Sequence, residues 1–484
     1  MRDLWLLKSV RWFILVTFLA LSYLQLDTGL ADNGDFTRVI NLFSPGPEGF
    51  FTNWPDPASE EWQYRFTNYW IPFWKLSFLP RYNWFSSVLL IWIPGIIANC
   101  IFFSKTTLFL PMVSLLPRIL SFLLIWKLLR YIDSRSLMPI VLYFSLVLPL
   151  SLILINTDYI AYFNSFYQET ASIVFLFLVL FSLNDYRCNS NSISSILLLA
   201  FSVFCLTTAK LSFFYIPVLI LPFVLWKRLL NNANPIRYLT MILLAIITPL
   251  LCASILVLNN PYAKYNAFHR LYNGVLTFSE NPESHLRDLG MEDGTNYLNT
   301  SGWSKEGAAF IERYKDKLTY QSFLRVLMKE PKILLKSMKY TSNNMQLITI
   351  SYLGKTRRNS ANISNARILT LWSVIKSSIF PRGVWFFIFI AFASIVFYFN
   401  VQSNSELISV FSYSGLFCTV ICLFDMIVAI LGEGKGELHK HLLLSNLSFD
   451  ITFLLFVSIL LLIVMKRLCL GDTKPGLHKT TRWN

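Results

Sequence analysis

Long apolar runs follow one another along the whole chain, and short polar segments separate them. An α-helix of about 20 apolar residues crosses the hydrocarbon core of a bilayer. Helices are the expected element because every backbone polar group must be satisfied inside lipid. The pattern therefore predicts an all-α polytopic membrane protein.

Two neighbouring apolar runs, 84–104 and 107–129, decide the topology. If both cross the membrane, the basic residues after the second run face outside. If the first run, broken by Pro94, instead lies along the outer interface or is re-entrant, every later loop changes side. The cytoplasmic segments then hold 15 Lys or Arg against five acidic residues, and the positive-inside rule favours this second register.

The favoured register predicts about ten transmembrane helices with both chain ends in the cytoplasm. We interpret the first as an uncleaved signal anchor, although Leu30-Ala31 could also serve as a cleavage site. The predicted spans are 12–30, 107–129, 137–155, 170–183, 193–209, 211–226, 238–258, 384–400, 407–431 and 450–465.

This register divides the chain into three regions. Residues 1–258 form a transmembrane module that includes the first and second outer loops. Residues 259–383 form an extracytoplasmic, basic and mostly helical segment. Residues 384–484 form C-terminal transmembrane helices with an outer loop, 432–449, and a cytoplasmic tail, 466–484.

The composition agrees with this class. Of the 484 residues, 55% are hydrophobic and only 14% are charged, whereas soluble domains are about 25% charged. The seven cysteines show no disulfide framework and no zinc spacing. The net charge of +15 is in large part topological, so we expect no nucleic-acid partner.

Part of the surplus of basic residues is not explained by the positive-inside rule, because it lies in the long outer segment, and long loops cross the membrane regardless of charge. Lysines at 329, 332, 336 and 339 alternate with leucines at helical spacing. This pattern is typical of an amphipathic helix at a lipid interface, where it could bind anionic headgroups. It could also hold a phosphorylated substrate.

The first outer loop begins with two carboxylates, Asp32 and Asp35, directly after the first span. Such a pair could act as a general base and its orienting partner. Partial desolvation at the membrane boundary is expected to raise the pKa of these carboxyls toward the useful range. A turn followed by a helix N-cap would also explain the same residues.

The second outer loop, 156–169, is short, acidic and rich in aromatic and amide side chains. Aromatic faces with directional hydrogen-bonding groups are suited to binding sugars. An interfacial aromatic belt would explain the rings, but not an acid so close to the start of a span. The candidate substrate-binding residues here are Asp158, Tyr162, Asn164, Tyr167 and Glu169.

Two further outer positions carry candidate polar residues. Lys210 lies at the outer end of a short hairpin, where it could pair with a carboxylate or a phosphate, or extend to the interface. In the last outer loop, Glu437, His439 and His441 could bind a metal ion. Contact with substrate, or closure of this loop over a site, is the interpretation we favour.

Together these residues resemble the plan of the GT-C glycosyltransferases, polytopic enzymes that take a sugar from a polyprenyl-phosphate carrier on the outer membrane face. In that superfamily an acid follows the first span, and interfacial helices precede the second. A second acidic motif, a Thr-x-Lys-like hairpin and a large outer segment come later. The chain is most similar to the bacterial hexose transferases of surface-layer glycan assembly, the WsfD group. The matching strings are Asp32 to Phe36, Tyr162 to Tyr167 with Glu169, Asn281 to Glu283 leading to Leu286 to Gly290, and Gly432 to His441 with Asn446 and Asp450.

The resemblance implies an inverting transfer of a sugar, a hexose in the similar group, to a glycan or lipid-linked acceptor. Asp35 would be the general base, with Asp32 as second choice, and Arg38 would lie beside the substrate. Asp158 and Glu169 would bind sugar hydroxyls, and Lys210 or a basic residue of 313–382 would contact the phosphate. Members differ in whether they use a divalent cation, so Mg or Mn stays open here.

The resemblance places the active site on the outer face of a bacterial plasma membrane. A transporter or flippase of lipid-linked or anionic glycans is the alternative, and it would explain the basic outer surface without catalysis. That class typically shows charges at mid-span and a repeated half. The sequence shows no repeat, and Asp425 is its main mid-span acid.

Overall fold

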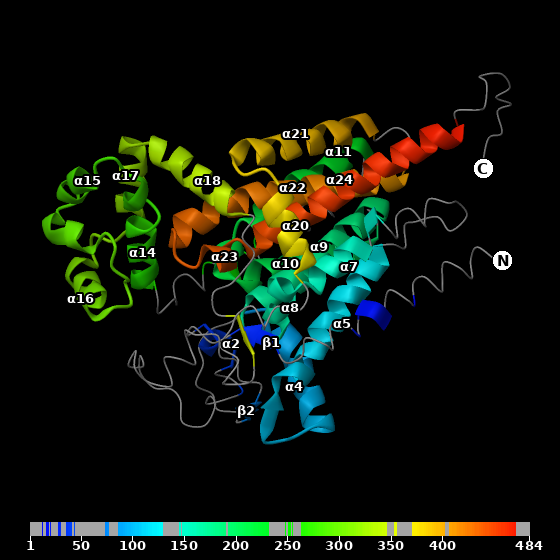
Figure 1. Cartoon of the computed structure of the whole chain (residues 1–484), viewed down its shortest axis with the longest axis horizontal. Helices are drawn as coiled ribbons and strands as arrows, with labels where there is room; N and C mark the ends of the chain where they lie inside the picture. Colours follow the sequence, from blue (N-terminus) through cyan, green and yellow to red (C-terminus); the bar gives the residue numbers. More distant parts are fainter. Residues whose placement is uncertain are drawn as a thin grey trace.

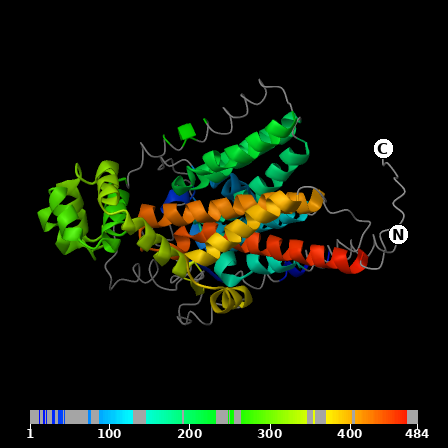
Figure 2. The same cartoon turned by 90° about the horizontal axis from the view of Figure 1, so that it is seen from above.

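The described part of the chain is almost entirely helical in the computed structural model (Figure 1). Long helices lie alongside one another in a bundle, and a group of shorter helices lies at one end of it (Figures 1 and 2). The predicted all-α membrane fold is confirmed. The structure describes residues 28–30, 35–40, 73–76, 86–128, 148–189, 192–231, 263–345, 353–355, 370–401 and 406–470, with isolated positions between them.

Within those residues, three helices are long and apolar enough to cross a membrane. They are α9 (Glu169–Cys188), α22 (Glu406–Glu433) and α24 (Leu443–Leu470). A fourth span is possible if α20 (Leu371–Ile379) and α21 (Val384–Val401), which are bent by 103°, count as one.

The predicted count of about ten spans is not shown. Apolar helices that fall short of a full span account for part of the difference. The predicted spans 12–30, 137–155 and 238–258 fall wholly or partly outside the described residues. The shorter bundle helices are α4 (Leu89–Phe102), α5 (Leu110–Leu128), α7 (Leu148–Leu154), α8 (Thr157–Phe163), α10 (Ile193–Ala209) and α11 (Ile216–Asn231).

Helix α4 is the segment on which the predicted topology depends. Its 14 residues rise by about 21 Å, which is less than the thickness of a hydrocarbon core. One amide closes the turn that follows: Asn99 Nδ2 donates to the carbonyls of Ser104 and Thr107, at 3.0 and 2.9 Å. The length of α4 agrees with a segment that does not cross by itself.

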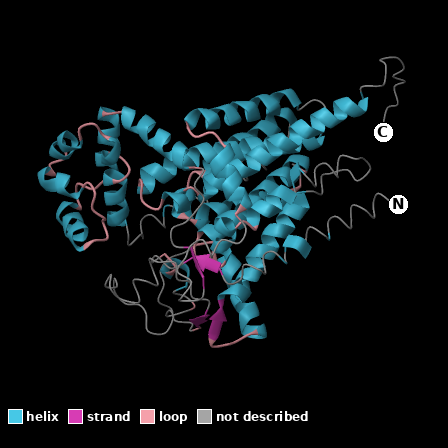
Figure 3. Ribbon diagram, viewed as in Figure 1, coloured by secondary structure: helices cyan, strands magenta, loops and turns pink. Residues whose placement is uncertain are grey.

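In the described part of the chain, four three-residue strands form two antiparallel pairs that the sequence pattern did not predict (Figure 3). One pair joins β1 (Thr28–Leu30) to β4 (Leu353–Lys355), and the other joins β2 (Phe73–Lys75) to β3 (Thr107–Phe109). The first pair joins the beginning of the chain to a segment far along it, and the second joins β2 to the residues directly before α5. In the sequence, β1 precedes the short helix α2 (Thr37–Ile40), and β2 follows it.

The helices at the end of the bundle form what we call the helical unit, residues 263–345. Phe268, Leu286 and Phe310 are buried in its core. That core continues without a break into Ile430 and Leu438 at the ends of α22 and the following loop. The unit consists of α14 (Ala263–Tyr272), α15 (Pro282–Asp288), α16 (Lys305–Tyr314), α17 (Tyr320–Lys329) and α18 (Lys332–Asn344).

The predicted amphipathic lysine helix is divided between α17 and α18, because Pro331 interrupts it. Lys329 lies 2.6 Å from a carboxylate oxygen of Asp288, and Lys336 lies 2.8 Å from one of Glu280. Two of the four lysines therefore form ion pairs within the helical unit.

Candidate functional site

Asp35 lies in the turn that opens α2. The next residue, Phe36, is buried and packs edge-on against the ring of Tyr167, with centroids 4.8 Å apart. This contact holds the segment that contains Asp35 against the segment between α8 and α9. Arg38, one turn along α2, places Nη2 3.0 Å from Asp35 Oδ1.

A lysine from the last loop completes the surroundings of Asp35. Lys440 lies in α23 (Leu438–His441), and its Nζ is 2.5 Å from Asp35 Oδ2. The same Nζ also pairs with the Glu437 carboxylate and lies 5.6 Å from the centre of the Tyr167 ring. Two predicted acids, Asp35 and Glu437, thus meet through a lysine that the sequence analysis did not single out.

A second ion pair lies beside the first. Lys210, at the end of α10, donates to Glu169 Oε1 at 2.8 Å, and its Nζ is 3.2 Å from His441 Nδ1. Its charge also acts on Asp35. We call the whole group the Asp35 network: Asp35, Arg38, Glu169, Lys210, Glu437, Lys440 and His441.

The electrostatics of Asp35 differ from the prediction. Burial acts to raise the pKa of its carboxyl, as expected, but the charges of Arg38 and Lys440 act in the opposite direction and outweigh it. The pKa of Asp35 lies well below its ordinary range. The expectation of a raised pKa was therefore wrong, because the sequence did not reveal the two cations. In turn, the charges of Asp35 and Glu437 outweigh the burial of Lys440 and raise its pKa.

The other predicted residues of the second loop lie deeper in the bundle. Asn164 is buried, and its Oδ1 accepts hydrogen bonds from Ser114 Oγ, at 3.0 Å, and from Arg118 of α5. Tyr162 is also buried, with its ring centroid 6.3 Å from that of Tyr167. These contacts make Asn164 and Tyr162 part of the wall behind the Asp35 network.

At the other end of α8 lies a separate set of polar residues, which we call the Asp450 cluster: Asp450, Lys376, Tyr159, Trp372 and Asn446. Lys376 Nζ is 2.7 Å from Asp450 Oδ1 and donates to Asn446 Oδ1 at 2.8 Å. Tyr159 and Trp372 donate to Asp450 Oδ2 at 2.7 and 2.8 Å. The cluster joins α8, α20 and α24.

Asp158 belongs to this second region and not to the Asp35 network. It lies in the first turn of α8, whose N-cap is Asn156. Ser373 Oγ of α20 is within hydrogen-bonding distance of both, 2.5 Å from Asp158 Oδ2 and 3.0 Å from Asn156 Oδ1. The predicted acidic motif is thus divided: Glu169 lies with Asp35, and Asp158 lies with α20.

Two predicted site residues and the predicted metal ligands remain to be placed. Asp32 lies outside the described residues. His439 lies in α23 and is half-buried. In the described ranges, no three His, Cys, Asp or Glu side chains are grouped so as to hold a metal ion, so Glu437, His439 and His441 form no such group there.

The sequence analysis missed Lys440, Lys376 and Arg118. Lys376 is a single cation in an otherwise apolar or hydroxylated helix, and Arg118 lies inside an apolar run. An isolated charge in such a run is a signal that could have been used. Lys440 carried no comparable signal, because it stands in a polar loop that holds charges of both signs.

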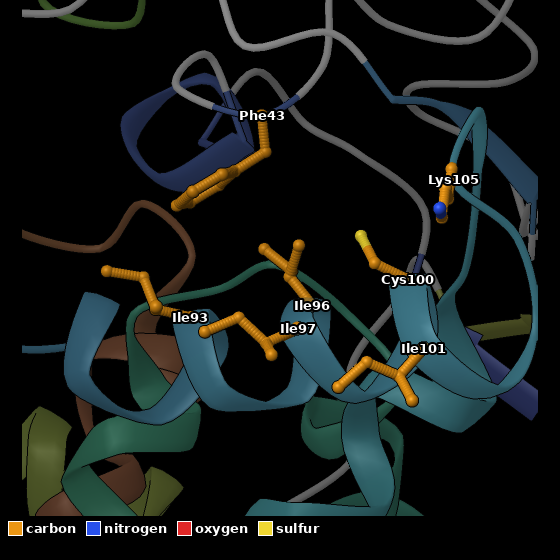
Figure 4. Close-up of a pocket in the computed structure, with 7 residues that line it drawn as sticks. All are labelled: Phe43, Ile93, Ile96, Ile97, Cys100, Ile101 and Lys105. Atoms are coloured by element: carbon orange, nitrogen blue, oxygen red, sulfur yellow. The ribbon is translucent and has the colours of Figure 1, made fainter.

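An apolar cavity of about 670 Å³ lies along α4 (Figure 4). Phe43 faces the helix across it, and Lys105 stands at one end. Its other walls are hydrocarbon and thiol, so it is suited to an aliphatic chain and not to a sugar. The remaining lining residues are Ile93, Ile96, Ile97, Cys100 and Ile101.

The fold and the charged residues thus define a helical membrane protein with a polar site at one end of its bundle. The chain belongs to the family described as the YfdI N-terminal transmembrane domain, which it matches over residues 5–479. It is 25% identical over 333 residues to the uncharacterized protein YfdI of Escherichia coli K12, covering 66% of this chain and 69% of that protein. No solved structure matches the chain.

Proposed function

We propose that the protein is a GT-C-type glycosyltransferase of the bacterial plasma membrane. It moves a sugar, a hexose by the resemblance, from a polyprenyl-phosphate donor to a glycan or lipid-linked acceptor on the extracytoplasmic face. The observation that carries the proposal is the Asp35 network. Residues of four separate segments meet there, and the sequence alone predicts six of the seven as site residues: Asp35, Arg38, Glu169, Lys210, Glu437 and His441.

The chemistry required of this site is simple. Asp35 removes the proton of an acceptor hydroxyl, and the resulting oxygen attacks the anomeric carbon as the phosphate leaves from the opposite side, which inverts the configuration. The cations Arg38 and Lys210, which remain in the site when Lys440 withdraws, balance the charge of the phosphate as it leaves. Asp35 is ionised at neutral pH, so it can accept a proton once Lys440 withdraws.

The apolar cavity along α4 supports a lipid-linked donor. An aliphatic chain in that cavity would lie beside α4, the helix of the first outer loop, and Lys105 would stand near its polar end.

A transporter is the alternative, and Asp425 of α22 was its main support. Tyr215 donates to Asp425 Oδ1 at 2.9 Å, and Ser445 Oγ donates to Oδ2 at 2.8 Å. An acid held on both oxygens within the bundle is typical of a structural role. This observation favours the enzyme over the transporter.

The test is to replace Asp35 by Asn in cells that depend on this chain for a glycan addition, and to analyse the surface glycan by mass spectrometry. We expect the addition to fall by about 10²- to 10⁴-fold, because a general base typically contributes that much. Asp293→Asn, in the helical unit, is the matched control and should leave the addition unchanged. Near-normal addition by Asp35→Asn, with equal protein in the membrane, would refute the catalytic role.

Orientation needs a separate test. A cysteine at the buried position 164 would not react with a thiol reagent from either side of the membrane, whereas Gly436 is exposed in the last loop. A cysteine at position 436, on a background without native cysteines, should react with a membrane-impermeant thiol reagent in intact cells. Protection until the cells are opened would place the Asp35 network in the cytoplasm and contradict the proposed face.

A further inference from the structure

The loop that carries Lys440 is fastened to the helical unit by backbone contacts. Gly434 has φ +73°, and a Cβ there would lie 2.1 Å from the carbonyl carbon of Asn273 at the end of α14. A Cβ on Gly274 would lie 2.9 Å from the carbonyl oxygen of Ile430. The end of α14 and the loop after α22 approach so closely that only glycine fits at these positions.

Side chains fasten the same loop. Lys435 Nζ lies 4.8 Å from the ring centre of Phe278 and 5.2 Å from that of Tyr340, both in the helical unit. Leu438 is only 4% exposed and packs in the core of that unit, as does Leu442. The loop therefore has apolar, cation–π and backbone contacts on the side away from Asp35.

The opposite side of the loop closes on the Asp35 network. Lys440 bridges Asp35 and Glu437, and His441 lies against Lys210. Between the two sets of contacts, Glu437 adopts φ 43° and ψ 35°, a left-handed conformation that is unfavourable for a residue with a Cβ. Such a conformation persists only where surrounding contacts hold it.

We propose that residues 434–441 form a strap that closes over Asp35, and that the helical unit holds the strap shut through Gly434 and Lys435. In the closed form, Lys440 is paired with the Asp35 carboxylate. Release of the strap withdraws Lys440, frees the carboxylate and relaxes the conformation of Glu437. The proposal rests on the proposed function only in taking Asp35 as the centre of the site.

The test measures opening of the strap directly, without measuring sugar transfer. Leu438→Cys, on a full-length background without native cysteines, is treated with a thiol-reactive maleimide in permeabilised cells, so that the side of the membrane does not matter. Buried in the closed strap, this cysteine should react slowly, and complete labelling in denaturant gives the total. Gly434→Ala should raise the labelling rate about tenfold or more, because a Cβ cannot fit against Asn273.

The chain offers a matched control. A Cβ on Gly432 meets nothing within 4 Å, so Gly432→Ala should leave the labelling rate within about twofold of the parent. Leu286→Cys, in the core of the helical unit, should stay protected in the Gly434→Ala background if only the strap opens. Lys435→Ala and Lys440→Met, which each remove one set of contacts, should give intermediate rates.

Two results would overturn the proposal. One is a rate in Gly434→Ala equal to that in Gly432→Ala. The other is labelling of the parent at the rate seen in denaturant, which would show a strap that is already open. If Gly434→Ala also exposes the cysteine at position 286, Lys435→Ala becomes the deciding variant. An unchanged labelling rate of Leu438→Cys in that variant would then overturn the proposal. None of these outcomes depends on Asp35 acting as a base, so a failure here and a failure of Asp35→Asn to lose transfer remain distinguishable.

Discussion

The Asp35 network and the Asp450 cluster use the same chemistry, a carboxylate paired with a lysine, in two different settings. The side chains of Asp35 and Glu437 are 19% and 40% exposed, whereas those of Asp450 and Lys376 are 0% and 1% exposed. Both oxygens of Asp450 are held by groups on other helices. A carboxylate that substrate can reach is suited to chemistry, and one that is enclosed is suited to fixing helices in place.

Among the variants that test this comparison, we expect the largest loss of stability from a substitution of Lys376. Lys376→Met leaves the Asp450 charge buried without its cation, and loss of one partner of such a pair costs about 3–5 kcal/mol. The double variant Lys376→Met/Asp450→Leu should recover much of that loss, since no charge is left buried. Thermal unfolding of the purified protein in detergent measures both. A single variant as stable as the parent would show that the cluster does not hold α20 in place.

The corresponding change in the Asp35 network is Lys440→Met. We expect a smaller loss, about 1.5–3 kcal/mol, because water can reach Asp35 and Glu437 after the cation is removed. The same unfolding experiment measures it. Lys264→Met, which breaks an exposed pair with Glu312, should leave the midpoint unchanged. A loss as large as that of Lys376→Met would remove the distinction between the two regions.

A single hydrogen bond from a hydroxyl group should matter less than either ion pair. Ser373→Ala removes the hydroxyl that Asp158 and Asn156 share, and we expect a loss of about 1 kcal/mol. Ser377→Ala, on the exposed side of α20, is the control and should have no effect. Equal midpoints for the two variants would indicate that the contact between α8 and α20 is not stabilising.

The smallest expected effect is that of pH on the Asp35 pairing. The pKa of Asp35 is lowered in the folded protein, so its contribution to stability is present above the pKa of the unfolded carboxyl, about 3.9, and is lost as the pH falls below that value. The stability difference between the parent and Asp35→Asn should therefore be constant from about pH 5 to pH 8. A difference that changes between those limits would indicate a raised pKa and an Asp35 that is not paired with Lys440.

Much of the Asp35 network could be predicted because most of its members, though not Lys440, had a local signal. Asp35 follows an apolar run, Glu169 begins the next long helix, and Lys210 ends a hairpin. Loops at one end of a helix bundle lie close together, so polar residues in them are expected to meet. The fold class followed from the same apolar runs.

What could not be predicted depends on contacts between distant segments. The division of the second loop arises because Asp158, in α8, lies against α20, whereas Glu169, at the start of α9, lies against the end of α10. The strand pairs are three residues long, too short for a pattern to be seen. The lowered pKa of Asp35 required knowledge of Lys440, which is 405 positions away along the chain.

The shared core of the helical unit has a consequence for biosynthesis. Phe268, Tyr272 and Phe310 pack against Ile430 and Leu438, which are made well after the unit itself is complete. At about 5–20 residues per second, the unit waits on the order of ten seconds for its last packing partners. During that interval its apolar face is a substrate for chaperones. Truncation of the chain before α22 should therefore yield an aggregation-prone fragment instead of a folded domain.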